Sequence, residues 1–326
     1  MAKPKVLATH KLFDAARKSL DASCDVEYWE KQERPRREEL LRQVRDKEGL
    51  VCLLTERIDE ELLNEAPKLR IVANVAVGFD NIDLAACTKH GAVATNTPGV
   101  LDDTTADFAW TLMMAVARRL GEGEALARSG NWKGWNLDQL VGTDVSGKTL
   151  GLVGFGRIGR AMARRANGFQ MKVIYNDAQR VAENVEKELK AEYRELDRLL
   201  MEADFVSVHV PLLPETRRLF DAAKFALMKR AAFFINTARG AVVDEAALVQ
   251  ALESGAIAGA GLDVFEKEPM IHPGLKRANV VLTPHIASAS LETRTKMACI
   301  AAENVIVFIK GNRPPNMLNP EAFQAR

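Results

Sequence analysis

The sequence KTLGLVGFGRIG occupies residues 148–159 and decides the fold of the region around it. Its apolar start, TLGLV, is typical of a buried strand, and the stretch ARRANGF that follows is helical in character. Gly154, Gly156 and Gly159 have the spacing that binds dinucleotides at a strand-to-helix turn. The first glycine permits the tight turn, the second lets the backbone approach a pyrophosphate, and the third lets helix and strand pack closely. We therefore expect a dinucleotide site at this turn.

Asp177 ends the next apolar run, KVIYND at residues 172–177. It follows Gly154 by close to the roughly 20 residues expected of an acid that binds a ribose. Its carboxylate can accept hydrogen bonds from ribose hydroxyls and would repel the additional phosphate of NADP, so NAD is the preferred cofactor. Arg180 could neutralise that phosphate, which keeps NADP as a second candidate. Alternatively, Asp177 only begins the following turn and Arg180 is a solvated loop charge.

Short apolar runs and helical stretches alternate along most of the chain. A first series covers residues 5–96, with the apolar runs KVLAT, CDVEYW, GLVCLLT and RIVANVA. A second series begins with KTLGLVGF and KVIYND and continues with FVSVHV, AFFINTA, GAGLDV and VVLT. Strands that alternate with helices predict a parallel sheet. The fold class is therefore α/β, with two domains that each contain a parallel sheet.

Two longer helical stretches set the expected domain boundaries. One helix is expected over residues 102–130, where capping Asp and Thr residues open the stretch, and it would bridge the two domains. Another is expected from about Ser290 to Lys310, and its simplest path returns to the first domain. We therefore expect a dinucleotide-binding domain at residues 99–289 and a discontinuous substrate domain at residues 1–98 and 290–326.

Composition limits the partners and the compartment. Among 326 residues, Lys plus Arg number 45 and Asp plus Glu number 44, which leaves a net charge of +1 and argues against nucleic acid or an anionic membrane as a partner. The four cysteines are scattered without metal-type spacing, so reduced thiols and no metal site are expected. No apolar stretch has the length of a membrane span or of a signal-peptide core, which favours a cytoplasmic protein.

Three distant residues form the expected chemical site: Arg239 in INTARG, Glu268 in VFEKEP and His285 in LTPHIASAS. Each follows an apolar run, so a parallel sheet could bring all three to one edge. An arginine can hold a carboxylate through two hydrogen bonds, and a histidine backed by an acid can pass a proton to or from a neighbouring carbonyl oxygen. Such a set suits hydride transfer to a 2-oxo acid.

Each of these residues also has a simpler interpretation. Arg239 could form a surface salt bridge, and Glu268 could be a solvated loop acid like its neighbour Glu266. The chain contains five histidines, and a histidine without context is more often structural than catalytic. His285 differs because small residues, including Ser288, follow it and leave room for a substrate.

Six segments together resemble the D-isomer-specific 2-hydroxyacid dehydrogenase family, and in particular its glyoxylate and hydroxypyruvate reductase branch. They are NVAVGFDNID, NTPGVLDDTTADFAWTLMMAVARR, GKTLGLVGFGRIG, INTARG, GLDVFEKEP and LTPHIASAS. The resemblance implies a flavodoxin-like substrate domain, a Rossmann dinucleotide-binding domain and a homodimer. It also implies an NAD(P)-dependent oxidoreductase in which Arg239, Glu268 and His285 are catalytic.

The resemblance further implies roles for individual positions. Val77 and Gly78 would bind the substrate carboxylate together with Arg239, and His285 and Ser288 would also contact the substrate. Trp135, in NWKGWNLDQL, would reach the substrate site of the neighbouring subunit. The expected cofactor contacts, in addition to the three glycines of the motif, are Arg157, Ile158, Asp177, Val210, Thr216, Thr237, Ala238 and Asp263. Many members of the branch lack an acid at the position of Asp177 and prefer NADPH, so this chain departs from them there.

Other functions stay open at this stage. The substrate could be another small 2-oxo acid, such as pyruvate, 2-ketogluconate or a branched-chain acid, because discrimination by one methylene is worth only about 1–3 kcal/mol. A different class is an NAD-sensing binding protein that resembles the corepressor relatives of the family. Detectable turnover separates the two classes.

Overall fold

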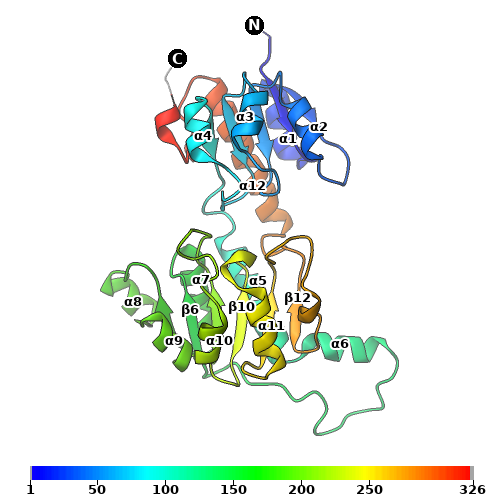
Figure 1. Ribbon diagram of the computed structural model, residues 1–326, viewed down its shortest axis with the longest axis vertical. Helices are drawn as coiled ribbons and strands as arrows, with labels where there is room; N and C mark the ends of the chain where they lie inside the picture. The colour runs from blue at the N-terminus through cyan, green and yellow to red at the C-terminus, as the bar shows by residue number, and fades with distance from the viewer. Residues whose placement is uncertain (1, 324–326) are drawn as a thin grey trace. The chain divides into compact units, whose positions relative to one another are not determined.

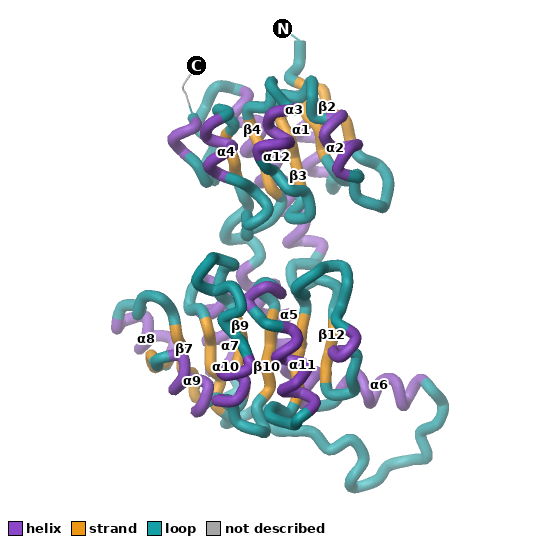
Figure 2. The backbone as a smooth tube through the Cα atoms, in the orientation of Figure 1, coloured by secondary structure: helices purple, strands orange, loops and turns teal. Residues whose placement is uncertain are grey.

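The computed structural model describes residues 2–323, which divide into two compact units. The terminal unit comprises Met1–Leu101 and Ala289–Arg326, and the central unit comprises Asp102–Ser288. Each unit contains one β-sheet, as Figure 2 shows, and the strand pairs of both sheets are parallel, so the predicted fold class is confirmed.

The central unit is built on a seven-stranded sheet in the order β12-β11-β10-β9-β6-β7-β8. All of its strand pairs are parallel. The strands are β6 (Thr149–Val153), β7 (Lys172–Asn176), β8 (Ala191–Tyr193), β9 (Phe205–Val208), β10 (Phe233–Asn236), β11 (Gly259–Leu262) and β12 (Val280–Leu282). The order reverses between β6 and β9, and ligands bind at such a switch point in open α/β sheets.

Helices cover both faces of this sheet (Figure 1). The helices of this unit are α5 (Asp102–Ala117), α6 (Leu120–Arg128), α7 (Arg157–Gly168), α8 (Glu183–Leu189), α9 (Leu196–Glu202), α10 (Ala222–Leu227) and α11 (Glu245–Glu253), of which α6 projects away from the sheet. Residues of α9, α10 and α11 contribute to the core on one face, and residues of α5 and α7 to the core on the other. Because both faces are covered, the residues of the central strands β9 and β10 are all buried, including the polar residues Ser207 and Asn236.

The terminal unit is built on a five-stranded sheet in the order β2-β1-β3-β4-β5, which is the flavodoxin-like order. Its strands are β1 (Lys5–Ala8), β2 (Asp25–Tyr28), β3 (Gly49–Cys52), β4 (Ile71–Asn74) and β5 (Val93–Thr95). Its helices are α1 (Asp14–Ser23), α2 (Arg37–Gln43), α3 (Glu60–Glu65), α4 (Leu84–Lys89) and α12 (Leu291–Ile309). The residues of α1 and α12 pack on one face of the sheet, and those of α2, α3 and α4 pack on the other.

Helix α12 confirms the helix predicted from about Ser290 to Lys310. The Ser290 side chain caps it by accepting a hydrogen bond from the Thr293 amide. The segment that follows α12 then reaches β5, where Met317 forms a bridge with Thr95. The first and last parts of the sequence therefore share one core.

The single helix predicted over residues 102–130 is wrong. The chain forms α5 and α6, and Arg119 between them adopts a left-handed conformation with φ 53°. Helix α5 packs against β10, β11 and α7 with nine buried residues, whereas α6 buries none. The residues of α6 continue the helical sequence pattern of α5. That pattern does not indicate the left-handed conformation of Arg119, which separates the two helices.

None of the helices in residues 2–323 combines the length and the apolar character that crossing a bilayer needs.

Candidate active site

The turn between β6 and α7 has three glycines with different surroundings. Gly154 has φ 97°, and a Cβ there would lie 2.6 Å from the carbonyl carbon of His209. A Cβ on Gly159 would lie 2.2 Å from the carbonyl oxygen of Gly154. Gly156 differs, because a Cβ there would meet no described atom within 4 Å. The first and third glycines are therefore required by close packing, and the second leaves the start of α7 open to a ligand.

The acid at the end of β7 turns toward this glycine turn. The Phe155 amide donates a hydrogen bond to Asp177 Oδ2 at 2.6 Å. Phe155 itself is buried, and its ring stacks on Tyr175 with 4.0 Å between the ring centroids. Arg157 and Ile158 begin α7, so their amides are among those without an intrahelical partner. A pyrophosphate at this turn and a ribose at Asp177 would thus be neighbours.

The loop after β10 carries Arg239 and is held by Asn236, the last residue of that strand. The Asn236 side chain accepts a hydrogen bond from the Ala238 amide and donates one to the Arg239 carbonyl oxygen, both at 2.9 Å. Arg239 Nη1 donates to the Ala238 carbonyl oxygen at 2.9 Å. Because Asn236 is buried, this small polar turn fixes the backbone from which the guanidinium extends.

Gly240 brings this loop against the loop that follows β11. A Cβ on Gly240 would lie only 1.9 Å from the carbonyl carbon of Phe265, so no other residue fits there. Phe265 belongs to the same loop as Glu268, and its amide donates to Glu268 Oε1 at 3.0 Å. The close backbone approach therefore places Arg239 next to the loop that holds Glu268.

Glu268 and His285 form a direct pair. His285 Nδ1 lies 2.9 Å from Glu268 Oε2, and both side chains are partly buried. Burial acts to raise the pKa of the Glu268 carboxyl. The hydrogen bond and charge of His285, the Phe265 amide and the charge of Arg239 outweigh burial, so this pKa lies below its ordinary value. All three predicted catalytic side chains are thus gathered at the carboxyl ends of β10, β11 and β12.

Asp263 organises the loop that carries His285. Its fully buried carboxylate accepts hydrogen bonds from Thr283 Oγ1, the Ile286 amide and the Ala287 amide, at 2.7–2.8 Å. The His285 amide donates to the Asp263 carbonyl oxygen, and His285 has φ 56°, in the left-handed region. A residue other than glycine persists there only where its surroundings hold it, and such positions concentrate at functional sites. The Asp263 carboxylate is therefore engaged by the loop that carries His285.

The other four histidines have different environments. Burial lowers the pKa of His209 to about 3 and that of His10 to about 4, so both stay neutral at cellular pH. His90 Nε2 lies 3.4 Å from Glu60 on the terminal unit, and His272 accepts a hydrogen bond from the Gly274 amide. Among the described histidines, His285 combines a close carboxylate with a place at the sheet edge.

Val77 and Gly78 belong to the terminal unit and follow β4. Asn96 donates to the Val77 carbonyl oxygen at 2.8 Å, and Asn74 donates to the Gly78 carbonyl oxygen at 3.0 Å. Within residues 2–323, neither the Val77 amide nor the Gly78 amide donates a hydrogen bond. The loop therefore holds two amides that are available to an anion.

The remaining predicted contacts lie mainly around the central sheet. Thr237 is buried, and its Oγ1 has no hydrogen-bond partner in the described chain, so it can serve a bound group. Thr216 Oγ1 instead donates to the Pro211 carbonyl oxygen at 2.6 Å and so stabilises its own loop. Val210, Ala238 and Ser288 are partly buried at the ends of β9, β10 and β12.

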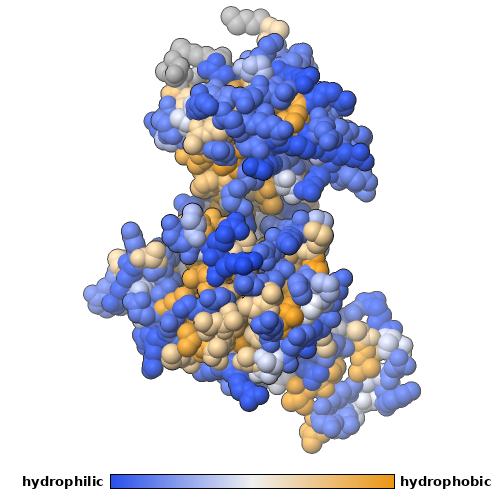
Figure 3. All heavy atoms as spheres, viewed as in Figure 1, coloured by the Kyte–Doolittle hydropathy of each residue, from blue (hydrophilic) through white to orange (hydrophobic). Residues whose placement is uncertain are grey.

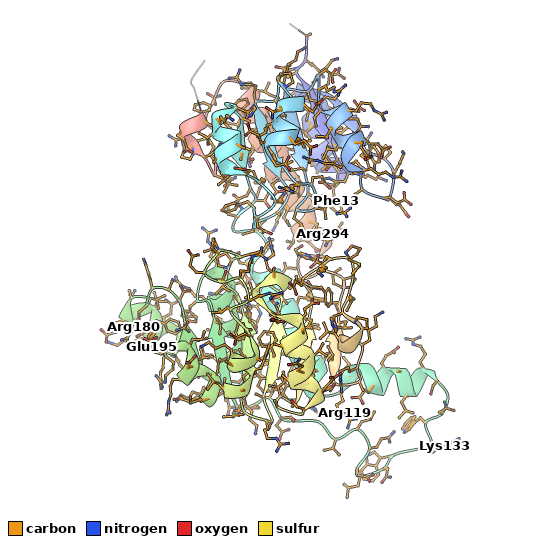
Figure 4. All side chains as sticks on the ribbon, in the orientation of Figure 1. Phe13, Arg119, Lys133, Arg180, Glu195 and Arg294 are labelled. Carbon is orange, nitrogen blue, oxygen red and sulfur yellow. The ribbon has the colours of Figure 1, made fainter. Side chains whose placement is uncertain are left out.

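Trp135 lies in the long loop after α6, and 81% of its surface is exposed. Figure 4 labels Lys133 in the same loop. Among the described residues, no group of three or more His, Cys, Asp or Glu side chains could hold a metal ion.

The structure gives two buried polar residues, Asn236 and Asp263, roles that the sequence does not predict. The sequence predicts no role for Asn236, and it predicts Asp263 only as a cofactor contact. The signal was a buried-type apolar run that ends in a polar side chain, FFIN and AGLD, because such a group needs a nearby partner when buried. Which partner it takes depends on the neighbouring loops.

The fold and these side chains define a class of protein. A doubly wound sheet with a glycine turn at its switch point binds a dinucleotide, and an arginine beside an acid–histidine pair suits hydride transfer to a carbonyl. The class is therefore a nicotinamide-dependent oxidoreductase.

Comparison with known proteins defines the family. A family model described as D-isomer specific 2-hydroxyacid dehydrogenase, NAD binding domain, matches residues 110–287. The glyoxylate reductase of Korarchaeum cryptofilum (strain OPF8) is 50% identical over 99% of this chain and 98% of its own. A solved structure of a protein from Thermus thermophilus has a TM-score of 0.91 at 44% identity, with 96% of this chain and 99% of that chain covered.

A second solved structure is that of an NADPH-dependent glyoxylate/hydroxypyruvate reductase from Sinorhizobium meliloti in complex with NADP and malonate. It has a TM-score of 0.87 at 31% identity, with 100% of this chain and 99% of that chain covered. The chain belongs to the D-isomer-specific 2-hydroxyacid dehydrogenase family. It is an NAD(P)-dependent oxidoreductase that acts on the CH–OH group of its donor.

Proposed function

We propose that this enzyme reduces small 2-oxo acids, with glyoxylate and hydroxypyruvate as its main substrates. The observation that carries the proposal is the Glu268–His285 pair at 2.9 Å, beside the loop of Arg239. The names of the relatives support glyoxylate as the first substrate to test. In this proposal the central unit, close to residues 99–289, binds the dinucleotide, and the terminal unit contributes to substrate binding.

Arg239 binds the substrate carboxylate in this mechanism. Its planar guanidinium offers a pair of parallel donors that match a carboxylate and can also polarise the neighbouring carbonyl oxygen. The Val77 and Gly78 amides are the proposed second contact for the same carboxylate. Two sets of donors would fix the orientation of the small anion, which is a large part of what such a reaction requires.

His285 supplies the proton to the carbonyl oxygen. Glu268 has a lowered pKa and is therefore an ionised carboxylate that only accepts hydrogen bonds, so the hydrogen of the His285–Glu268 contact is on Nδ1. This leaves Nε2 to face the substrate, where it donates a proton during reduction and accepts one during oxidation. Reduced nicotinamide supplies the hydride that goes to the carbonyl carbon.

We propose NAD as the preferred cofactor, held by the glycine turn and by Asp177. Gly156 leaves open space for a pyrophosphate at the start of α7, and the unpaired Thr237 hydroxyl is a further polar contact for the dinucleotide. The Asp177 carboxylate would accept hydrogen bonds from the adenosine ribose and repel a 2′-phosphate. Arg157, Ile158, Val210, Thr216, Ala238, Ser288 and Asp263 complete the proposed sites.

A homodimer is the proposed assembly. The segment formed by α6 and the loop to Leu140 exposes large apolar side chains, of which Leu120, Trp132, Trp135 and Leu137 are each more than half exposed. Figure 3 shows hydrophobic residues interspersed with hydrophilic ones on this part of the central unit. A second copy of the chain would cover them and place Trp135 near its substrate site. The free thiols of all four cysteines fit a reducing compartment, and we propose the cytoplasm.

The test is a spectrophotometric screen of NADH and NADPH oxidation with glyoxylate, hydroxypyruvate, pyruvate and 2-ketogluconate. We expect the highest kcat/KM with glyoxylate or hydroxypyruvate, and D-glycerate as the product from hydroxypyruvate. Turnover of pyruvate or 2-ketogluconate alone would contradict the substrate assignment. NAD binding without turnover of any 2-oxo acid would instead favour an NAD-sensing binding protein.

A further inference from the structure

The loop after β7 contains an arginine that is held by an acid on α8. Arg180 Nε donates to Glu186 Oε1 and Arg180 Nη2 donates to Glu186 Oε2, both at 2.8 Å. This side-on, two-bond arrangement is the strong form of an arginine–carboxylate pair. The Arg180 side chain is 64% exposed, but that of Glu186 is only 10% exposed. The pair therefore fixes a surface arginine on a nearly buried anchor.

Glu186 depends on this partner because a buried carboxylate is costly without one. The hydrogen bonds from Arg180 and Tyr175 lower the pKa of Glu186 to about 2, so it is ionised at cellular pH. Tyr175 Oη donates to Glu186 Oε1 at 2.6 Å and accepts a hydrogen bond from the Val181 amide at 3.1 Å. These contacts tie α8, β7 and the loop between them into one network.

The network lies beside the proposed ribose site. Tyr175 stacks on Phe155, and the Phe155 amide donates to Asp177, the acid proposed to bind the ribose. The Arg180 guanidinium lies 5.9 Å from the centre of the Tyr193 ring. Burial raises the pKa of the Tyr193 hydroxyl, and this pKa is also lowered by the charge of Arg180 and raised by that of Asp177, so both charges lie near Tyr193. Figure 4 labels Arg180 on the flank of the central unit that carries α8.

We infer that Glu186 is a specificity-determining residue, which favours NAD by holding Arg180 away from the position of a 2′-phosphate. The inference rests on the proposed dinucleotide site and deepens it. In this arrangement Asp177 repels the phosphate directly. Glu186 adds a second barrier in two ways. It occupies the Nε–Nη2 edge of the Arg180 guanidinium, and its negative charge offsets the positive charge with which Arg180 could bind the phosphate.

The test is Glu186→Gln, which keeps the shape of the side chain and removes the charge that holds Arg180. We expect the ratio of NADPH to NADH efficiency to rise about tenfold, as expected when a charge-assisted contact becomes available to a phosphate. Combined with Asp177→Ser, the increase should be larger than either change produces alone. Dissociation constants for NADH and NADPH, from fluorescence titration, provide the same ratio without any substrate.

Two controls separate this role from a general effect. Glu183→Gln removes the same charge from the same helix, but Glu183 is three-quarters exposed and pairs with Lys187, so the ratio should not change. In the double variant Arg180→Ala, Glu186→Gln the gain should disappear, because it requires the released arginine. If the role of Glu186 were merely structural, the affinities for NADH and NADPH would change equally.

This experiment can contradict the role of Glu186 without contradicting the proposed reductase function. An unchanged ratio in a folded Glu186→Gln variant, or a gain that survives removal of Arg180, would overturn the inference while the reductase assignment stands. A decrease in the ratio would mean that the pair presents Arg180 to the phosphate, which also overturns it. If Glu186→Gln does not fold, Arg180→Ala decides: we expect the ratio of NADPH to NADH affinity to stay unchanged, because Arg180 is held by Glu186 in the wild type, and a selective loss of NADPH affinity would overturn the inference.

Discussion

Arg239 is placed by its neighbours more than by its own side chain. Asn236 holds the turn that precedes it, and the absence of a side chain on Gly240 lets the turn lie against Phe265. The guanidinium is then delivered beside the Glu268 loop, where its charge lowers the pKa of Glu268 together with the larger contribution of His285. A guanidinium presents paired, planar donors, which match the two oxygens of the carboxylate in the proposed substrate.

Arg239→Lys should therefore be a severe substitution. An ammonium keeps the charge but loses the two parallel donors, so we expect kcat/KM for the 2-oxo acid to fall by about a hundredfold. The dissociation constant for NADH should stay within about twofold, because no part of the proposed dinucleotide site is removed. Steady-state kinetics and a fluorescence titration measure the two effects.

The matched control for that substitution is Arg277→Lys. Arg277 pairs with Glu253 on the surface of the central unit, and its replacement should leave both measurements unchanged. Wild-type kcat/KM in the Arg239→Lys variant would remove Arg239 from the substrate site.

Glu268→Gln tests the charge behind His285. Gln keeps the contact with the Phe265 amide but cannot act as an ionised acceptor for His285 Nδ1, so we expect kcat to fall about a hundredfold with a small change in KM. A fall confined to KM would contradict the proton-transfer role. Glu266→Gln is the matched control, because it removes the same charge from the same loop at a residue that pairs with Arg218, and it should leave kcat unchanged.

Comparison of Glu268→Gln with the wild type also has a predicted pH dependence of stability. The pKa of Glu268 lies below its ordinary value of 4.5 in the folded protein, so its ionised form stabilises the fold above that value. This contribution is lost as the pH falls through 4.5 and then through the folded pKa. Wild type should therefore have a higher melting temperature than Glu268→Gln at about pH 7, and the difference should shrink as the pH falls below that ordinary value. A difference that grows on acidification would contradict the sign of the shift.

At the scale of elements, glycines decide how closely loops approach one another. Gly240 lies where two loops touch, whereas Gly156 faces open space at the start of α7. The two positions should therefore respond to the same added methyl group in opposite ways. One change tests the packing of the sheet edge, and the other tests the proposed dinucleotide site.

We expect Gly240→Ala to destabilise the protein by about 1–3 kcal/mol or more, because the loops after β10 and β11 must separate. Gly156→Ala should leave the melting temperature within about one degree of wild type and weaken NADH binding about tenfold, since the methyl group would meet the pyrophosphate. Thermal unfolding and NADH titration measure both. Gly168→Ala, also in open space but at the end of α7, should change neither. A Gly156→Ala variant with normal NADH affinity would argue against the proposed pyrophosphate position.

At the scale of the whole molecule, the last part of the described chain completes the terminal unit. The buried Asn319 side chain accepts a hydrogen bond from the Ala94 amide at 2.8 Å and donates to the Ala92 carbonyl oxygen and to Thr88 Oγ1, both at 3.0 Å. These bonds join the segment after α12 to β5 and to the end of α4. More than 200 residues separate the partners in sequence.

Asn319→Ala should leave several buried polar groups without partners and cost about 2–3 kcal/mol of unfolding free energy. Urea unfolding measures this cost, and hydrogen exchange should report faster opening at the Ala94 amide. Asn312→Ala, at an exposed asparagine shortly after α12, should change stability by less than about 0.5 kcal/mol. Equal stability of the two variants would mean that the tail contributes little to this unit.

The fold class follows from the sequence because the information is local. Apolar runs such as FFIN predict strands through burial, and GFGRIG requires glycine for reasons that involve only the adjacent strand, turn and helix. The triad of Arg239, Glu268 and His285 could be named for the same reason, since each residue follows a recognisable strand in a parallel sheet. Short polar strands gave a weaker signal: β8, with the sequence AEY, was not among the predicted runs.

The tertiary structure decided everything that depends on contacts between distant segments. The sequence pattern continued a helix through Arg119, where the backbone in fact turns. It also contained no sign that Asp263 would bind the His285 loop or that Glu186 would hold Arg180. The physical reason is that periodicity records which residues are buried, whereas the partner of a buried charge is set by strand order, register and loop conformation.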